Sequence, residues 1–187
     1  MRFLDTLLGR TKAASSDLDR LFALPAAGVT LQAATGLTFA RRAAVCFKPT
    51  GDPDFDQAVS EAVQLARLDR LRTELVEDRY QYRWAVFADG GLDELVTAVH
   101  GVNATLEERS YGNQLLCSAF AFDAPGDPLP LLVVYLYKRG SFYPFARRAK
   151  NDRDTEMELS VRSALGSDLP VEPELERWFP LWDSPID

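Results

Sequence analysis

The chain has 187 residues, of which 47% are hydrophobic and 26% are charged, a balance typical of a folded soluble protein and not of a disordered chain. Its 28 acidic residues outnumber its 21 basic residues, so the formal net charge is −7, the wrong sign for a protein that wraps nucleic acid. The length fits one domain with terminal appendages, and we expect a helical arm over residues 1–24 followed by a single domain over residues 25–187.

The N-terminal residues predict a short amphipathic helix with one apolar face. That face consists of Phe3, Leu4, Leu7 and Leu8. A second helical piece is expected to begin at Ser15 or Ser16 and to end at Leu24–Pro25. The apolar face has three possible docking sites: the chain's own domain, a partner helix or a membrane surface. Burial of so small a face is too weak for permanent membrane anchoring, which favours docking on protein.

Neither export nor membrane insertion is predicted. The first nine residues contain no continuous apolar core and no small-residue cleavage site, so they do not resemble a signal peptide. The longest strongly apolar stretch, residues 129–137, is far shorter than the roughly 20 residues that a membrane-spanning helix needs. We therefore expect a cytoplasmic protein with at most peripheral membrane contact.

The first half of the chain predicts a strand followed by a helix. From Gly28 to Cys46 the alternation of apolar residues favours β structure, and residues 43–47 predict a buried strand. Turn-forming residues 50–54 then place Pro53 at the first position of an amphipathic helix that runs to about Leu71.

The middle of the chain predicts further strands around a second helix. Residues 73–88 alternate with a period of two, which indicates either one hairpin near Asp78 or one long bent strand. Apolar residues at helical spacing predict an amphipathic helix over residues 92–106. Strands are predicted over residues 115–122 and 131–137.

This order of elements predicts an α+β fold. It matches an antiparallel sheet with two helices on one face, as in ferredoxin-like folds or a related split βαβ sandwich. The N-terminal arm and C-terminal helices are expected as additions. Residues 156–165 fit a strand or a helix, and their helical spacing favours the helix. Residues 171–179 predict a short terminal helix.

The chain carries no recognisable catalytic or metal-binding signature. Its single histidine, His100, has no cysteine or carboxylate three or four positions along the helix, whereas a zinc site needs three or four convergent ligands. Cys117 lies in a predicted strand, where packing is the usual role of a cysteine. Gly90 and Gly91 lack the lysine and the glycine spacing of a phosphate-binding loop. We expect no enzyme activity, no metal and no cofactor.

The two cysteines leave one question open. Cys46 and Cys117 each lie inside an apolar run, so buried free thiols are the default expectation. A disulfide remains possible if two neighbouring strands carry them. The chain has too few cysteines for a small disulfide-stabilised secreted domain.

A basic and aromatic segment stands out from the acidic background. Its candidate partner-binding residues are Lys138, Arg139, Phe142, Tyr143, Phe145, Arg147 and Arg148. One interpretation is a surface for an acidic partner or an anionic membrane. The other is a hairpin edge in which the aromatic residues close the core and the basic residues keep the rim soluble. Both interpretations remain open at the level of sequence.

Several blocks resemble the PspA-associated protein family called PspAB, in the same order and over nearly the whole chain. They are MRFLDTLLGR (1–10), VCFK (45–48), NATLEE (103–108), QLLCS (114–118), VYLYKRG (134–140), FYPFA (142–146), DLPVEP (168–173) and RWFP (177–180). The resemblance implies an accessory role in the envelope-stress response of phage-shock protein A, PspA, a membrane-remodelling coiled-coil protein. It also implies association with a membrane metallopeptidase of the HtpX type. It supplies no catalytic residue.

Two functions follow as hypotheses. The first is a non-enzymatic adaptor that binds a PspA-like coiled-coil protein through Phe3, Leu4, Leu7 and Leu8, through the basic and aromatic segment, or through both. The second is a regulator that binds a small molecule or a peptide, or an unrecognised hydrolase, with a cleft near Cys117, His100 and Tyr137.

Overall fold

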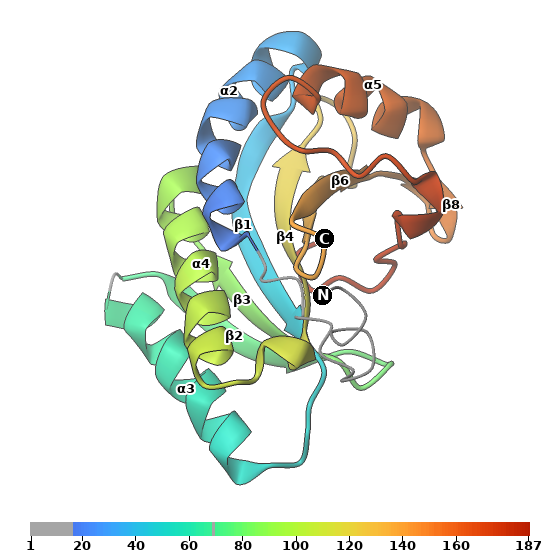
Figure 1. Cartoon of the computed structure of the whole chain (residues 1–187). Coiled ribbons are helices and arrows are strands. Elements are labelled where there is room, and N and C mark those ends of the chain that lie inside the picture. Colours follow the sequence, from blue (N-terminus) through green and yellow to red (C-terminus); the bar gives the residue numbers. More distant parts are fainter. Residues whose placement is uncertain (1–16, 69) are drawn as a thin grey trace, which may run out of the picture.

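A computed structural model describes residues 17–187 apart from residue 69, and it confirms the α+β class (Figure 1). Its main feature is a six-stranded antiparallel sheet with the strand order β2-β3-β1-β4-β5-β6. The strands are β1 (Thr38–Phe47), β2 (Arg72–Glu77), β3 (Arg83–Ala88), β4 (Leu115–Asp123), β5 (Leu131–Leu136) and β6 (Ser141–Phe145). A second, two-stranded sheet pairs β7 (Arg147–Ala149) with β8 (Asp152–Arg153).

Two interleaved strand–helix–strand units build the first four strands of the sheet. One unit is β1–α3–β2 with helix α3 (Pro53–Leu68), and the other is β3–α4–β4 with helix α4 (Leu92–Glu108). The strands of each unit are separated by one strand of the other, which is the split βαβ arrangement expected from the sequence. Strands β5 and β6 extend the sheet beyond β4.

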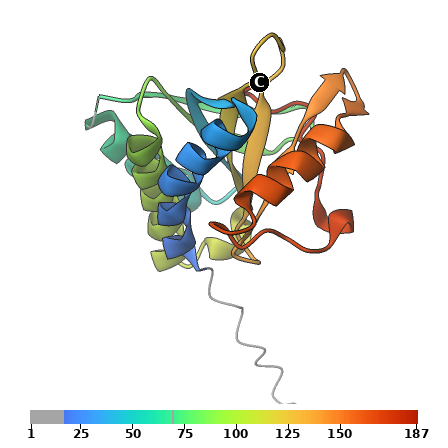
Figure 2. The same cartoon turned by 90° about the horizontal axis from the view of Figure 1, so that it is seen from above.

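Four α-helices and one 3-10 helix of the described chain pack on one face of the sheet, where only two helices were expected. The 3-10 helix η1 (Leu18–Ala23), α2 (Leu24–Thr35) and α5 (Thr155–Leu165) join α3 and α4. Figure 2 shows α4, α2 and α5 side by side in this layer. The larger hydrophobic core lies between this layer and the sheet, and it includes Phe47, Phe55 and Phe87.

Two predictions for the region around Pro25 are wrong. The helix does not end at Pro25, because a proline in the first turn of α2 lacks only an N–H that has no partner inside the helix. The alternation from Val29 to Leu31 is not β structure either. Leu24, Ala27 and Leu31 are buried at helical spacing while Val29 is exposed, and the helix ends only at Gly36, which has a left-handed backbone with φ of 77°.

The hairpin interpretation of residues 73–88 is confirmed, and Asp78 organises its turn. The carboxylate of Asp78 accepts hydrogen bonds from the backbone N–H groups of Tyr80 and Tyr82 at 2.8 and 2.9 Å. Its other oxygen accepts from the Trp84 indole at 2.9 Å. These bonds fix the loop that joins β2 to β3.

The C-terminal region matches its prediction in one part only. Residues 155–165 form the favoured helix, α5, and the Asp154 side chain caps it by accepting from the backbone N–H of Met157 at 3.1 Å. The expected terminal helix is reduced to one 3-10 turn, η3 (Leu175–Arg177). Residues 178–187 contain no helix or strand.

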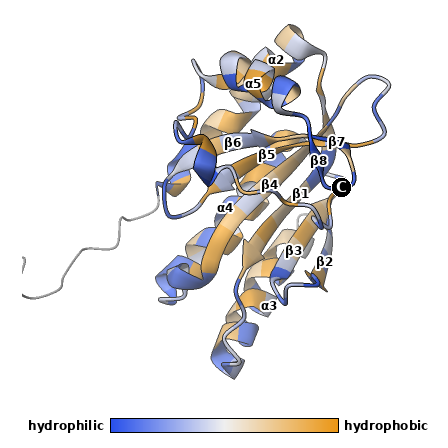
Figure 3. Ribbon diagram, turned by 90° about the vertical axis from the view of Figure 1, so that its right-hand side faces the viewer, coloured by the Kyte–Doolittle hydropathy of each residue, from blue (hydrophilic) through white to orange (hydrophobic). Residues whose placement is uncertain are grey.

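Residues 171–187, here called the C-terminal strap, cover the face of the sheet opposite the helices. Side chains on β1, β4, β5 and β6 alternate between the two faces, so the second face is also apolar. Figure 3 shows that these strands consist mainly of hydrophobic residues. Trp178 and Ile186 of the strap are buried in the smaller core on this face. The strap therefore performs the role that a second helical layer has in other α/β sandwiches.

The strap begins as an addition to the exposed edge of β6. The backbone N–H of Phe142 donates to Pro170 at 2.9 Å, and the N–H of Glu172 donates to Phe142 at 2.7 Å. Val171 forms a parallel bridge with Phe142. Because these bonds use backbone groups that an edge strand leaves unpaired, they hold the start of the strap in register with the sheet.

We expect Trp178→Ala to lower the free energy of unfolding by about 3–5 kcal/mol. Trp178 stacks on Tyr143 with ring centroids 6.1 Å apart, and its indole donates to the backbone oxygen of Glu172 at 3.0 Å. Phe179→Ala is the matched control, because its side chain is 57% exposed, and a change within about 0.5 kcal/mol is expected. Urea denaturation measures both. If Trp178→Ala does not fold, Trp178→Phe should show a smaller loss; equal stability of both Trp178 variants and the wild type would refute the anchoring role.

Candidate functional site

A cleft of about 780 Å³ lies between the strap and the second face of the sheet. Its volume falls in the range of about 300–1,000 Å³ that is typical of ligand sites, and its lining is mainly apolar. The lining comes from the β2–β3 hairpin, the adjoining ends of β1, β4 and β5, the β5–β6 turn, Tyr143 and strap residues 177 and 179–184.

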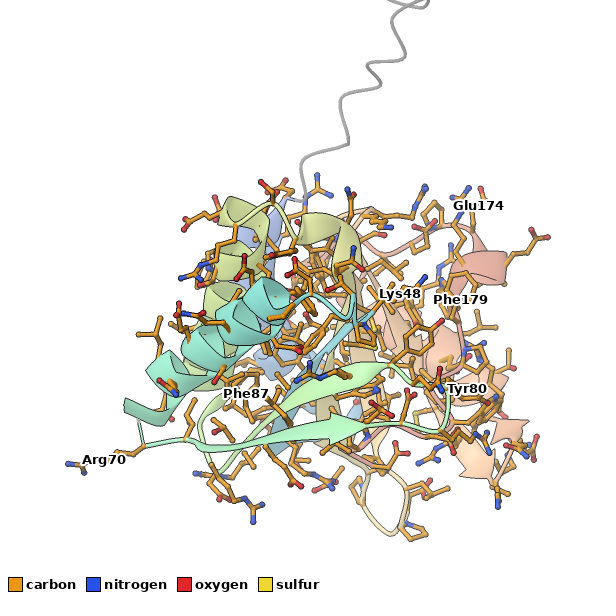
Figure 4. All side chains as sticks on the ribbon, turned by 90° about the horizontal axis from the view of Figure 1, so that it is seen from below. Lys48, Arg70, Tyr80, Phe87, Glu174 and Phe179 are labelled. Carbon is orange, nitrogen blue, oxygen red and sulfur yellow. The ribbon has the colours of Figure 1, made fainter. Side chains whose placement is uncertain are left out.

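Aromatic side chains form the walls of this cleft, which we call the aromatic cleft. Tyr80, Tyr82 and Trp84 come from the hairpin, and Phe179 and Trp182 come from the strap. Tyr80 is 56% and Phe179 is 57% exposed, so both rings reach solvent at the rim. Figure 4 shows these two residues on the same side of the molecule, Tyr80 on the hairpin and Phe179 on the strap.

The two cysteines lie in the lining of the aromatic cleft and face each other across neighbouring strands. Cys46 on β1 is the register partner of Cys117 on β4, and both are buried free thiols. The hydrogen-bond contact with Cys117 and burial raise the pKa of the Cys46 thiol well above its ordinary value. The expectation of buried free thiols is confirmed, and the strands that carry them are neighbours.

A cationic group occupies one end of the cleft around a buried carboxylate. Lys138, Arg139 and Arg177 line this end. Glu172 is 1% exposed and accepts from Arg139 at 2.8 Å and from Arg177 at 3.3 Å. Two arginines thus share this one carboxylate, and with Lys138 in the same lining this end has a local positive excess.

The pKa of Glu172 lies below its ordinary value. Burial acts in the opposite direction, but hydrogen bonds to the charged form outweigh it. They come from Ser141, the backbone N–H of Glu174, Arg139 and Arg177. The carboxylate therefore stays ionised and ties the strap to the β5–β6 turn.

The acidic groups of the cleft are at the hairpin. Asp78 is engaged by the hairpin turn and by Trp84, as described above. Asp183 of the strap pairs with Arg79 of the hairpin at 2.7 Å. The strap is thus held at both sides of the cleft by charged contacts, at Glu172 and at Asp183.

The aromatic part of the predicted basic and aromatic surface is not a surface. Phe142, Tyr143 and Phe145 are at most 1% exposed, because all three belong to β6, whose two faces are both covered. Phe142 packs toward the helices, whereas Tyr143 and Phe145 pack toward the strap. Tyr143 contributes to the cleft lining, and its hydroxyl donates to the backbone oxygen of Phe179 at 2.8 Å.

The basic residues of the same segment are divided between two places. Lys138 and Arg139 are exposed at the cleft end. Arg147 is only 10% exposed and pairs with Asp187 at 2.8 Å, so it holds the end of the strap. Arg148 is exposed and pairs with Asp154 at 3.1 Å. The hairpin-edge interpretation describes this segment better than a continuous partner surface does.

The structure does not bring together the three residues of the alternative hypothesis. Cys117 faces the strap, whereas Tyr137 is buried in the core on the helical face. His100 on α4 lies 3.5 Å from Asp19, and its ring packs on Phe22 with centroids 4.7 Å apart. A Cys117–His100 nucleophile pair is therefore excluded by the sheet that separates the two side chains.

The apolar face formed by Phe3, Leu4, Leu7 and Leu8 lies outside the described residues. Within residues 17–187 apart from residue 69, no three or more His, Cys, Asp or Glu side chains are grouped as metal ligands. No helix in that part of the chain is long and apolar enough to cross a membrane.

Comparison with known proteins identifies the family. A family model for PspA associated protein B, PspAB, matches residues 1–186. The chain belongs to the PspAB family. Searches of curated proteins and of solved structures each gave no match. The family name links this chain to PspA, and the residues of the aromatic cleft belong to the matched region.

Sequence reasoning missed most of the aromatic cleft in this PspAB chain. The period-two alternation of residues 73–88 did not separate Tyr80 and Tyr82, which belong to the hairpin turn, from the strands on either side. Trp182 was not singled out, and Phe179 was assigned to a terminal helix. The usable signal was composition: five of the last ten residues, 178–187, have large apolar side chains without a periodic pattern, namely Trp178, Phe179, Leu181, Trp182 and Ile186.

We expect both cysteines to react slowly with iodoacetamide in the native protein. The reactive species is the thiolate, and the raised pKa of Cys46 together with the burial of both residues keeps it scarce at pH 8. Intact-mass measurement should show alkylation more than about tenfold slower than in the same chain unfolded in urea. Equal rates in the native and unfolded chains would contradict the described burial.

We also expect Glu172→Gln to destabilise the protein in a pH-dependent way. A lowered carboxyl pKa contributes stability above the unfolded value of 4.5, and this contribution is lost as pH falls through the lower folded value. The difference in unfolding free energy between variant and wild type should be full at pH 7 and smaller at pH 3. Glu174→Gln, at an exposed neighbouring position, is the control. A difference that does not change with pH would refute this role of Glu172.

Proposed function

We propose that this chain is a non-enzymatic accessory protein of a PspA-linked envelope-stress response, and that it binds an apolar segment of a partner protein in the aromatic cleft. The proposal places it in the cytoplasm, at the inner face of the membrane through its partner. Family membership supports the link to PspA. The aromatic cleft is the single observation that supports binding as the activity.

The chemistry of the cleft favours an apolar occupant with polar ends. Large aromatic rings give much contact area at low conformational cost, which is why Tyr and Trp dominate the binding energy of many interfaces. The rings of Tyr80 and Phe179 are already at the rim, so an incoming segment meets them first. Lys138 and Arg139 at one end match an acidic group next to the apolar stretch.

The side chains in the cleft support binding more than bond-making chemistry. The Cys46 thiol has a raised pKa, which disfavours the nucleophilic thiolate. Asp78 and Asp183 are engaged in the hairpin turn and with Arg79. A general acid or base needs a free proton-transfer position facing the substrate, and these contacts occupy the carboxylates.

A PspA-like coiled-coil protein is the first partner to test, and an HtpX-type membrane peptidase is the second. A helical coiled-coil protein offers apolar residues at regular spacing, which is the kind of segment that an apolar groove binds. A small apolar molecule remains the second candidate occupant, because the volume of about 780 Å³ also suits a ligand of that class.

We expect the double variant Tyr80→Ala/Phe179→Ala to bind the PspA-like protein at least about tenfold more weakly than the wild type, because both rings are lost from the rim. Both side chains are more than half exposed, so the fold should be retained. Leu136→Asp, which places a charge at a half-buried lining position, should abolish binding. Titration calorimetry with the purified proteins measures all three affinities.

The control is Val29→Ala/Leu65→Ala, which removes two similarly exposed apolar side chains from the helical layer, at 70% and 59% exposure. It should bind as the wild type does. Wild-type affinity in Tyr80→Ala/Phe179→Ala and in Leu136→Asp would exclude the cleft as the partner site. If the PspA-like protein does not bind even the wild type, the same variants are titrated against the cytoplasmic part of the peptidase.

A further inference from the structure

We infer that the aromatic cleft also binds this chain's own N-terminal peptide, residues 1–16, so that the peptide competes with the partner. This inference rests on the proposed function, because it assigns a second occupant to the same cleft. Two observations support it. The structure gives the position of Asp17, the first described residue, and the sequence predicts an apolar face over residues 3–8 that needs a docking site.

The described chain begins on the helical side of the sheet, at the β5–β6 turn, and the same turn carries the cationic end of the cleft on the other side. The backbone oxygen of Asp17 accepts from the Tyr135 hydroxyl at 3.0 Å. Arg20 donates to Asp17 at 2.7 Å and to the backbone oxygen of Gly140 at 2.7 Å. Gly140 directly follows Arg139, which lines the cleft. These contacts fix the starting point of the N-terminal peptide at the β5–β6 turn.

The length of the peptide is sufficient to reach the cleft from this point. Eight residues, Gly9–Ser16, separate the predicted apolar face from Asp17. When extended, eight residues span up to about 26–29 Å. Because the β5–β6 turn at the starting point also carries the lining residues Lys138 and Arg139, this length is enough for residues 3–8 to pass around the turn and reach the cleft. A tether of this size also gives the peptide a high effective concentration at the cleft, on the order of millimolar.

The chemistry of the peptide fits the cleft. Phe3, Leu4, Leu7 and Leu8 offer one apolar face to a mainly apolar lining. The peptide carries three basic side chains and one acidic side chain, a net charge of +2, whereas the whole chain has a net charge of −7. The remaining residues therefore carry −9, but the nearest end of the cleft carries Lys138, Arg139 and Arg177, so the fit rests on the apolar face and not on charge.

The consequence is regulation by occupancy. While the N-terminal peptide occupies the cleft, the partner cannot enter it. The partner's apparent affinity therefore falls in proportion to the fraction of clefts that are open. A partner that also captures the released peptide would regain part of this loss.

Photo-crosslinking in the full chain tests the docking. With photoreactive p-benzoylphenylalanine in place of Leu8, ultraviolet light should link position 8 within the same chain to cleft residues such as Leu136, Leu181 or Trp182, as located by peptide mass spectrometry. The same chain with Leu136→Asp should lose this crosslink, whereas Leu65→Ala should keep it. Crosslinks confined to the helical layer, crosslinks only between two chains, or no crosslink would each overturn the inference.

Affinity gives the second readout. Leu4→Asp/Leu8→Asp in the full chain should bind the PspA-like protein at least about threefold more tightly than the wild type, because the competitor is released. Thr6→Asp, outside the predicted apolar face, is the matched control and should leave affinity unchanged. Unchanged or weaker binding of Leu4→Asp/Leu8→Asp would overturn the competition.

The failures of the two proposals are distinguishable. If Leu136→Asp weakens partner binding while the arm variant has no effect, the proposed function stands and the competing peptide is refuted. If the crosslink at position 8 reaches the cleft while no cleft variant alters partner binding, the peptide occupies the cleft and the partner site lies elsewhere.

Discussion

Burial of Trp178 and Ile186 against the second face of the sheet is the interaction on which the candidate site depends. The helices cover one face of the sheet, yet β1, β4, β5 and β6 carry apolar side chains on both faces. An antiparallel sheet with two apolar faces requires a cover on each, because exposed apolar surface is unfavourable in water. The strap supplies the second cover with 17 residues that include only one 3-10 turn. Without it, the floor of the aromatic cleft would be open solvent-facing sheet.

The cleft exists because the strap covers this face only in part. The central strands carry small side chains on the face below the strap, with Ala44 and Cys46 on β1 and Cys117 on β4. These small side chains leave space between the sheet and the strap. Trp178 fills the space near β6, and Ile186 fills the space at the other end of the strap. Contacts at Glu172, between Asp183 and Arg79, and between Asp187 and Arg147 hold the strap without filling the space below its middle. The volume that remains is the aromatic cleft.

Periodic spacing of apolar residues predicted the sheet and its helices. Much of the cleft lining, by contrast, comes from loops and the strap, where apolar residues have no periodic spacing. The apolar spacing of α3, α4 and α5 and the hairpin at Asp78 were visible in the sequence. The helix through Pro25 was missed, because a first-turn proline and a helix-ending proline look alike before the next turn is known. The burial of Tyr143 and Phe145 depends on the strap, which is distant in sequence. The register of Cys46 with Cys117 depends on strand order, which local spacing does not encode.

The division of the cleft between sheet and strap has a consequence for what it binds. Its floor belongs to central strands whose backbone groups are paired on both sides, so its shape is set by the most stable part of the fold. Its outer wall, from Phe179 to Ser184, lacks helix and strand and is held by side-chain contacts from Tyr143 to Phe179, from Arg147 to Trp182 and from Arg79 to Asp183. A wall with few backbone bonds adapts to its occupant at lower cost than the floor does. Such a site suits both proposed occupants, a segment of a partner and the N-terminal peptide, while the fixed floor limits how deeply an occupant can enter.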